Sequence, residues 1–134
     1  MKRAMRATAA ALLALTAGMQ PAAAQPPSAP DWVRVYDHAL GPITFDRASV
    51  RRDSDIVTLL SRTLLAEERP DGTKILEARF RYDCRARTSD LLSVSHLRSD
   101  GSVIASVEVV PAERLVEPIP AGSPNAAIAD AVCG

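Results

Sequence analysis

The middle of the chain alternates between apolar and polar residues with the two-residue period of half-buried strands. The pattern is clearest in segment 74–85, which follows a Pro-Asp-Gly turn sequence at residues 70–72. We expect this strand to pair antiparallel with residues 56–66, although the composition of that earlier segment also allows a helix. The alternation places one set of side chains in the core: Leu76, Ala78, Phe80, Tyr82 and Cys84.

Shorter β-favouring segments flank this central pair. Residues 32–37 and 42–45 are predicted to be two strands joined by a Gly-Pro turn. Residues 91–98 and 103–110 flank a Ser-Asp-Gly sequence, which predicts a second hairpin. Three prolines then indicate an irregular connection without a further central strand: Pro111, Pro118 and Pro120.

The pattern changes to a helical period at the C-terminus. Ser123 suits the helix cap, Pro124 suits the first helical position, and residues 125–133 can complete the helix before Gly134. One arc of this helix is apolar and should pack on the sheet: Ile128, Ala129, Val132 and Cys133. Six strands followed by one helix predict an α+β domain, in which an antiparallel sheet of about six strands packs against a short C-terminal helix.

The first 24 residues have the parts of a Sec-type signal peptide. Positive residues (Lys2, Arg3 and Arg6) precede the apolar run 7–17, and alanines at 22–24 predict cleavage after residue 24. A buried or amphipathic helix is the alternative, but the segment has no polar face. Because no cysteine follows the cleavage site and twin arginines are absent, we expect unfolded export without a lipid anchor.

Cleavage would leave a proline-rich leader, residues 25–30, and one domain, residues 31–134. It would also remove the longest apolar stretch, so no membrane span is expected in the mature chain, which we place in the periplasm or outside the cell. The 134-residue chain holds 16 Lys and Arg against 16 Asp and Glu. Loss of three basic residues makes the mature domain slightly acidic, which argues against a nucleic-acid partner.

The two cysteines are both predicted to point into the interface between sheet and helix. Cys84 lies on the apolar face of the clearest strand, and Cys133 lies on the apolar arc of the helix. A disulfide is the natural interpretation for an exported chain, and a closed loop of about fifty residues would contribute about 4 kcal/mol. Two buried free thiols are the alternative. A catalytic redox pair is less favoured, because such cysteines are closely spaced and exposed.

Sequence signatures of enzymes are absent: the chain has no Gly-rich phosphate loop, nucleophile elbow, CxxC or HExxH. His38 and His96 lie too far apart in sequence for their spacing to indicate a metal or acid–base pair. Ser93 and Ser95 lie near His96, but serines are common in strands. We therefore expect no catalytic residue, no metal, no cofactor and no enzyme activity.

A cluster of arginines is the strongest candidate for a binding surface. The mature chain has twelve Arg and one Lys, and guanidinium groups bind carboxylates, sulfates and aromatic faces more specifically than ammonium groups do. The alternative is an ordinary solvated strand face in which Glu77 and Asp83 neutralise their neighbours. The candidate protein-binding residues are Arg79, Arg81 and Arg85 on the polar face of the clearest strand, and Arg87 after them.

Residues 77–84 (Glu-Ala-Arg-Phe-Arg-Tyr-Asp-Cys) and a terminal Val-Cys at 132–133 after a capping serine form a moderately specific pattern. With shorter matches at 32–35, 45–51, 99–101 and 119–123, the mature chain resembles the surface-adhesin protein E domain family. The resemblance implies a six-stranded sheet packed with a helix, a Cys84–Cys133 disulfide and the option of a homodimer. For the adhesin that gives the family its name, the resemblance also implies binding to host matrix and plasma proteins such as vitronectin, laminin and plasminogen.

Our leading hypothesis is an exported, non-enzymatic protein-binding module that resembles an adhesin for host matrix and plasma proteins, and we expect its protein partner to be a matrix or an envelope protein. The alternative is a periplasmic inhibitor or an envelope-associated partner of another protein, in which the proline-rich loop 111–122 is the inserted element.

Overall fold

The computed structural model describes residue 18 and residues 29–134. Apart from Gly18, the predicted signal peptide, residues 1–24, lies outside the described residues. The predicted leader also lies outside them, except for residues 29 and 30. Cleavage and export therefore stay predictions.

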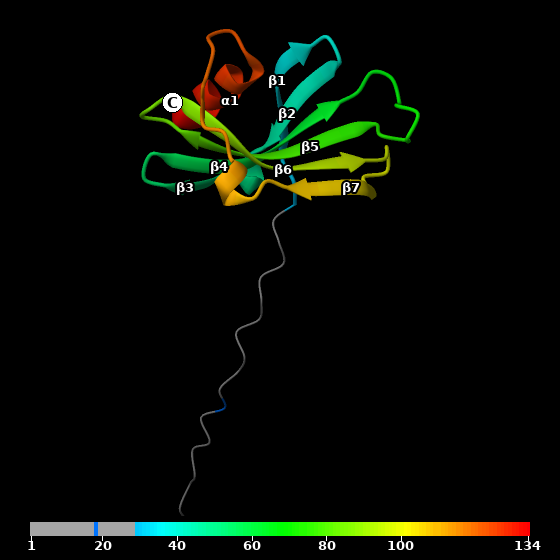
Figure 1. The fold of residues 1–134 in the computed structure, drawn as a ribbon, viewed down its shortest axis with the longest axis horizontal. Coiled ribbons are helices and arrows are strands. Elements are labelled where there is room, and N and C mark those ends of the chain that lie inside the picture. Colours follow the sequence, from blue (N-terminus) through cyan, green and yellow to red (C-terminus); the bar gives the residue numbers. More distant parts are fainter. Residues whose placement is uncertain (1–17, 19–28) are drawn as a thin grey trace, which may run out of the picture.

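The described chain folds into an antiparallel sheet with an α-helix on one side (Figure 1). The main strands follow the order β1-β2-β4-β5-β6-β7, while the short β3 pairs with β4 and the short β8 pairs with β6. Two 3₁₀ turns, η1 and η2, lie in the connections. The bounds are β1 Trp32–His38, β2 Gly41–Asp46, η1 Arg47–Ser49, β3 Arg51–Asp53, β4 Ile56–Leu64, β5 Ile75–Asp83, β6 Thr88–Leu97, β7 Val103–Glu108, η2 Pro111–Glu113, β8 Glu117–Pro118 and α1 Pro124–Cys133.

The predicted architecture is confirmed in its main features. The six longer strands and the C-terminal helix lie where the residue pattern places them, and segment 56–66 is a strand rather than a helix. The sequence did not predict β3 and β8, which have only three and two residues. β8 pairs at the margin of β6 and includes Pro118, so the connection contains no central strand.

The core lies between α1 and the face of the sheet that carries the apolar side chains of β4 and β5. In the β4–β5 register, Val57 is opposite Tyr82 and Leu59 is opposite Phe80. Because side chains alternate along a strand, these residues share one face. The buried cluster consists of Ile43, Phe45, Val57, Leu59, Tyr82, Ile128 and Ala129.

Helix α1 is capped at its start and attached to the sheet at its end. At its start, Ser123 is the N-cap, and its Oγ accepts a hydrogen bond from the Ala126 backbone N at 3.1 Å. At its end, a disulfide joins Cys133 to Cys84, with 5.4 Å between the Cα atoms. The predicted disulfide and the predicted capping serine are therefore confirmed.

The helix covers only part of the sheet. α1 contacts β1, and Figure 1 shows it beside that strand, whereas β7 forms the opposite edge of the sheet. Leu40 and Leu64 lie elsewhere, but most of the exposed large apolar residues of the described chain lie on and after β7: Val103, Val107, Val110, Leu115 and Val116. Because α1 is the one α-helix among the described residues, the face away from it carries no α-helix.

Candidate functional site: an arginine-bearing sheet face and two connected cavities

The face of the sheet away from α1, which we call the helix-free face, carries ordered rows of polar side chains. In the register, Leu60 is opposite Arg79 and Arg79 is opposite Ser93. One row along, Arg81 is opposite Asp90. These side chains alternate with the core residues of the same strands, so they point to the side without the helix.

Two ion pairs flank Arg79 on this face. Arg62 Nε lies 2.7 Å from Glu77 Oε2, and Arg81 Nε lies 3.0 Å from Asp90 Oδ1. Arg62 also stacks over the ring of Trp32, at 4.3 Å from its centroid. Arg79 itself is exposed and makes no ion pair within the part of the chain that the structure describes. It is therefore a guanidinium available to a partner.

The other two arginines of the predicted stripe do not share this strand face. β5 ends at Asp83, two residues earlier than predicted, so Arg85 and Arg87 lie in the turn to β6. The turn forms there because Asp83 Oδ1 accepts hydrogen bonds from the backbone N atoms of Arg85 and Ala86, at 3.0 and 2.9 Å. Arg87 adopts a positive φ of 55° and pairs with Asp130 at 3.2 Å.

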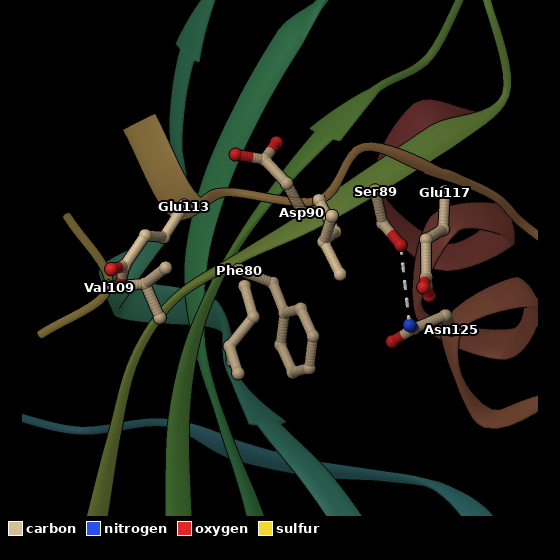
Figure 2. A pocket seen from close by; sticks show the side chains of 9 residues that line it. Phe80, Ser89, Asp90, Val109, Glu113, Glu117 and Asn125 are labelled. Carbon is tan, nitrogen blue, oxygen red and sulfur yellow. Dashed lines mark hydrogen bonds between the residues drawn. The ribbon is translucent and has the colours of Figure 1, made fainter. Parts of the chain in front are cut away.

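A pocket of about 320 Å³ opens at the margin of β6, beneath the connection that runs from β7 through η2 to β8. Figure 2 shows the Phe80 ring at its centre, with Val109 and Glu113 on one side and Glu117 and Asn125 on the other. The pocket is mostly apolar: Phe80, Leu91, Val109 and Leu115 form its walls.

Three carboxylates line the same pocket. Asp90 is buried, with 4% of its surface exposed, and only its Oδ1 is used by Arg81. Asp90 Oδ2 is buried without a hydrogen-bond partner among the described residues. Glu113 and Glu117 are exposed and take part in none of the ion pairs found in residues 29–134. Because Arg81 offsets Asp90, the two glutamates give the mouth of the pocket its negative charge.

A second cavity, of about 270 Å³, lies on the sheet face that carries α1. It shares three lining residues with the first pocket: Phe80, Leu91 and Asn125. The rest of its lining is largely apolar and includes Leu76, Ala78, Val94 and Ile128. The two cavities are therefore neighbours that share one wall, and together they form a depression that is acidic in the first cavity and largely apolar in the second.

Asn125, at the start of α1, connects this depression to the core. Its Oδ1 accepts a hydrogen bond from the Tyr82 hydroxyl at 3.0 Å, and its Nδ2 donates to Ser89 Oγ at 3.4 Å (Figure 2 draws the second bond). Burial raises the pKa of Tyr82, so the phenol stays neutral and remains a donor. The amide side chain is therefore held in one orientation.

The two histidines of the chain lie apart from these sites. His38 Nδ1 accepts from the Leu40 backbone N at 3.1 Å, while His96 Nδ1 lies 3.4 Å from Thr73 Oγ1, with β2, β4 and β5 between the two strands that carry them. Within residues 29–134 and at Gly18, no three His, Cys, Asp or Glu side chains are grouped to hold a metal ion. Neither histidine approaches the pocket.

The aspartates at turns have structural partners. A side-chain and a backbone hydrogen bond from Thr73 lower the pKa of Asp71, whose Oδ1 accepts from the Thr73 backbone N at 2.9 Å. Backbone and side-chain hydrogen bonds from Ser102 likewise lower the pKa of Asp100. These carboxylates stabilise the turns, as their positions before glycine suggested.

Sequence reasoning missed the pocket because its residues come from distant parts of the chain. Phe80, Leu91, Glu113 and Asn125 meet only when β5, β6, η2 and α1 are assembled. The available signal was weak: three glutamates (Glu108, Glu113 and Glu117) are interspersed among apolar residues, in a segment that its prolines mark as a loop.

The fold and its candidate sites define a class: a small, disulfide-linked α+β domain whose available surfaces are an open sheet face and a shallow double cavity. The sequence model of the family described as Surface-adhesin protein E matches residues 32–134. The chain therefore belongs to the surface-adhesin protein E family, and this membership supports an adhesin-like role.

Comparison with solved structures supports the same fold. The chain is similar to the structure of crystal form II of Haemophilus influenzae protein E, with a TM-score of 0.57 and 10% sequence identity. The match covers 81% of this chain and 91% of the other. No curated protein sequence gives a significant match. In the described residues, none of the helices is both long and apolar enough to cross a membrane.

Proposed function

We propose that the protein is an exported, non-enzymatic binding module that attaches to a host matrix or plasma protein. Membership of the surface-adhesin protein E family supports an adhesin-like role, and the sequence of the N-terminal segment supports export. The observation that carries the choice of surface is Arg79, exposed and without an ion pair among the described residues on a helix-free sheet face.

Acidic segments of a partner protein are the chemistry that this surface fits. A guanidinium can bind a carboxylate through two parallel hydrogen bonds, which adds geometric specificity to charge attraction. Arg79 lies on β5, and the exposed Arg85 lies in the turn that follows this strand. Arg81 and Arg87 lie between and beside them, already paired with Asp90 and Asp130. Arg79 and Arg85 are therefore the principal contacts, and the paired arginines add to the positive field.

The test replaces Arg79→Gln and Arg85→Gln together and measures binding of the mature, oxidised protein to vitronectin, laminin and plasminogen. We expect the affinity for at least one of them to fall about tenfold at physiological salt, with the melting temperature unchanged. Arg69→Gln is the matched control, because Arg69 is also exposed but lies in the β4–β5 connection. Unchanged binding by the double variant would exclude this surface.

A periplasmic role is the second candidate, in which the chain acts as an inhibitor or envelope-associated partner. The observation that favours it is the exposure of Leu115 and Val116, 74% and 56%, in the proline-rich connection 111–122. A pull-down from envelope extract, in parallel with the matrix panel, separates the two candidates. Replacement of 111–116 by a Gly-Ser loop would abolish envelope capture if the connection is the inserted element.

A homodimer is the remaining expectation that the family resemblance carries. The outer edge of β7 is unpaired within the described residues and could accept a strand from a second copy. Sedimentation equilibrium of the mature protein tests this, and a mass independent of concentration at the value of one chain would exclude it.

A further inference from the structure

We propose that the double cavity beside Asn125 is a docking groove for a partner polypeptide that inserts an arginine side chain into the acidic pocket and an apolar side chain into the neighbouring cavity. The groove contains neither Arg79 nor Arg85, so the inference does not depend on the function proposed above. It touches the ion pairs of the helix-free face only through their carboxylates, Asp90 and Glu77. The inference rests on the lining and charge of the two cavities and on the residues that they share.

The acidic pocket fits a cation that carries an apolar stem. Its walls are apolar, while Glu113 and Glu117 stand on opposite sides of its mouth without ion pairs in the part of the chain described. Long basic side chains bury their methylene groups against apolar surface and keep the charged head near water. The two glutamates are therefore placed for such a head group.

Arginine fits better than lysine because of Phe80. This half-buried ring is at the centre of the pocket and lines both cavities. A guanidinium stacks on an aromatic face and can still form paired hydrogen bonds with a carboxylate, whereas an ammonium acts as a point charge.

The second cavity argues for a polypeptide rather than a free amine. It shares Phe80 and Leu91 with the pocket, and Leu76, Ala78 and Val94 make it apolar. Exposed Leu115 and Val116 add apolar surface at the mouth. A free amine would leave this surface in water, whereas two side chains on the same face of an extended segment, about 7 Å apart, would cover both cavities.

The probes are two blocked pentapeptides, Thr-Leu-Thr-Arg-Thr and Thr-Arg-Thr-Leu-Thr, titrated into the isotope-labelled, mature, oxidised protein and followed by NMR. For at least one order, we expect saturable shifts centred on Leu91, Glu117 and Asn125. Glutamate in place of arginine should abolish the shifts, and lysine should weaken binding about threefold.

Variants of the protein separate the two cavities. Glu113→Gln with Glu117→Gln should weaken peptide binding about fivefold, and Val94→Thr about threefold, because one removes the charges and the other adds a hydroxyl to the apolar cavity. The matched control, Glu67→Gln with Glu68→Gln, removes two exposed charges from the β4–β5 connection and should leave the affinity unchanged.

Several results would overturn the proposal. One is that neither peptide shifts these resonances. Another is that the pocket variants and the control variant change the peptide affinity equally. Binding of free agmatine as tight as that of the better peptide would identify a small cation as the occupant. Concentration-dependent shifts at the same residues without peptide would identify a second copy instead. The Arg79→Gln/Arg85→Gln variant should bind the peptides normally, so failure of the matrix-binding proposal stays distinguishable.

Discussion

Tyr82 shows how one residue links the core to the candidate groove. The side chain is fully buried between β4 and α1, and its hydroxyl donates to Asn125 at the edge of both cavities. Its ring contributes apolar burial, while its hydroxyl orients the polar group that faces the cavity. A buried phenol with a single donor role also makes the stability of the fold sensitive to alkaline pH.

Tyr82→Phe should reduce that sensitivity. Burial raises the pKa of Tyr82 above the ordinary value of 10.0, so the unfolded chain ionises before the folded one. The contribution is therefore fully present below pH 10.0 and is lost as the pH rises above it. Between about pH 8 and about pH 10.5, the free energy of unfolding measured in urea should fall less for the variant than for the original protein. At the lower pH the variant should also be about 1 kcal/mol less stable, because it lacks the hydrogen bond to Asn125. Equal losses would contradict this origin.

Substitutions of Arg81 and Arg79 should have different effects on the free energy of unfolding, although the two residues are only two positions apart on one strand. Arg81→Met leaves Asp90 buried without its ion partner, which should lower the free energy of unfolding by about 2 kcal/mol. Arg79→Met removes an exposed side chain that has no ion pair in the described chain, and should change it by less than about 0.5 kcal/mol. Chemical denaturation of both variants provides the comparison, and equal effects would refute it.

The helix is the element most dependent on its attachments. α1 has ten residues, which is too short for a helix to be stable alone in water. It is retained by the Ser123 cap, the buried Ile128 and Ala129, and the Cys84–Cys133 bond. Strands β4 and β5, in contrast, pair along nine residues each in the centre of the sheet. We therefore expect local opening to begin at α1.

Replacement of both cysteines by alanine should test that expectation. Loss of the bond should lower the free energy of unfolding by about 2–4 kcal/mol, and hydrogen exchange should accelerate in α1 before β4 and β5. Ser123→Ala provides the comparison, because loss of the cap alone should cost about 1 kcal/mol. Unchanged exchange in α1 would show that packing alone retains the helix.

At the scale of the whole molecule, the two sides of the sheet have opposite chemistry. The helix-free face presents Arg79 to a partner, whereas the groove beside α1 has an acidic mouth and an apolar floor. The two sites meet only at the ion-paired carboxylates Asp90 and Glu77, and Arg79 is not part of the groove.

Independent binding at the two sites is the corresponding prediction. Saturation with the better arginine peptide should leave matrix-protein affinity unchanged within about twofold, because exposed charges on opposite sides of the sheet are screened at physiological salt. Competition binding with immobilised matrix protein measures this directly. Mutual displacement by the peptide and the matrix protein would instead indicate a shared or coupled site.

Local patterns in the sequence determined most of the fold. Alternation with a period of two identified the β5 strand face, and Ser123 and Pro124 located the start of α1 to the residue. Because Cys84 and Cys133 both fall on inward faces, their pairing followed from the same patterns. Such features depend on neighbours within a few residues, which the sequence displays directly.

Tertiary structure alone decided the sites. The pairing of Arg81 with Asp90 depends on strand register, and it leaves Arg79 as the arginine available on the face. The double cavity depends on how far α1 covers the sheet. Each of these follows from contacts between distant segments, whose positions are set by the packing of the whole domain and not by the residues next to them in the chain.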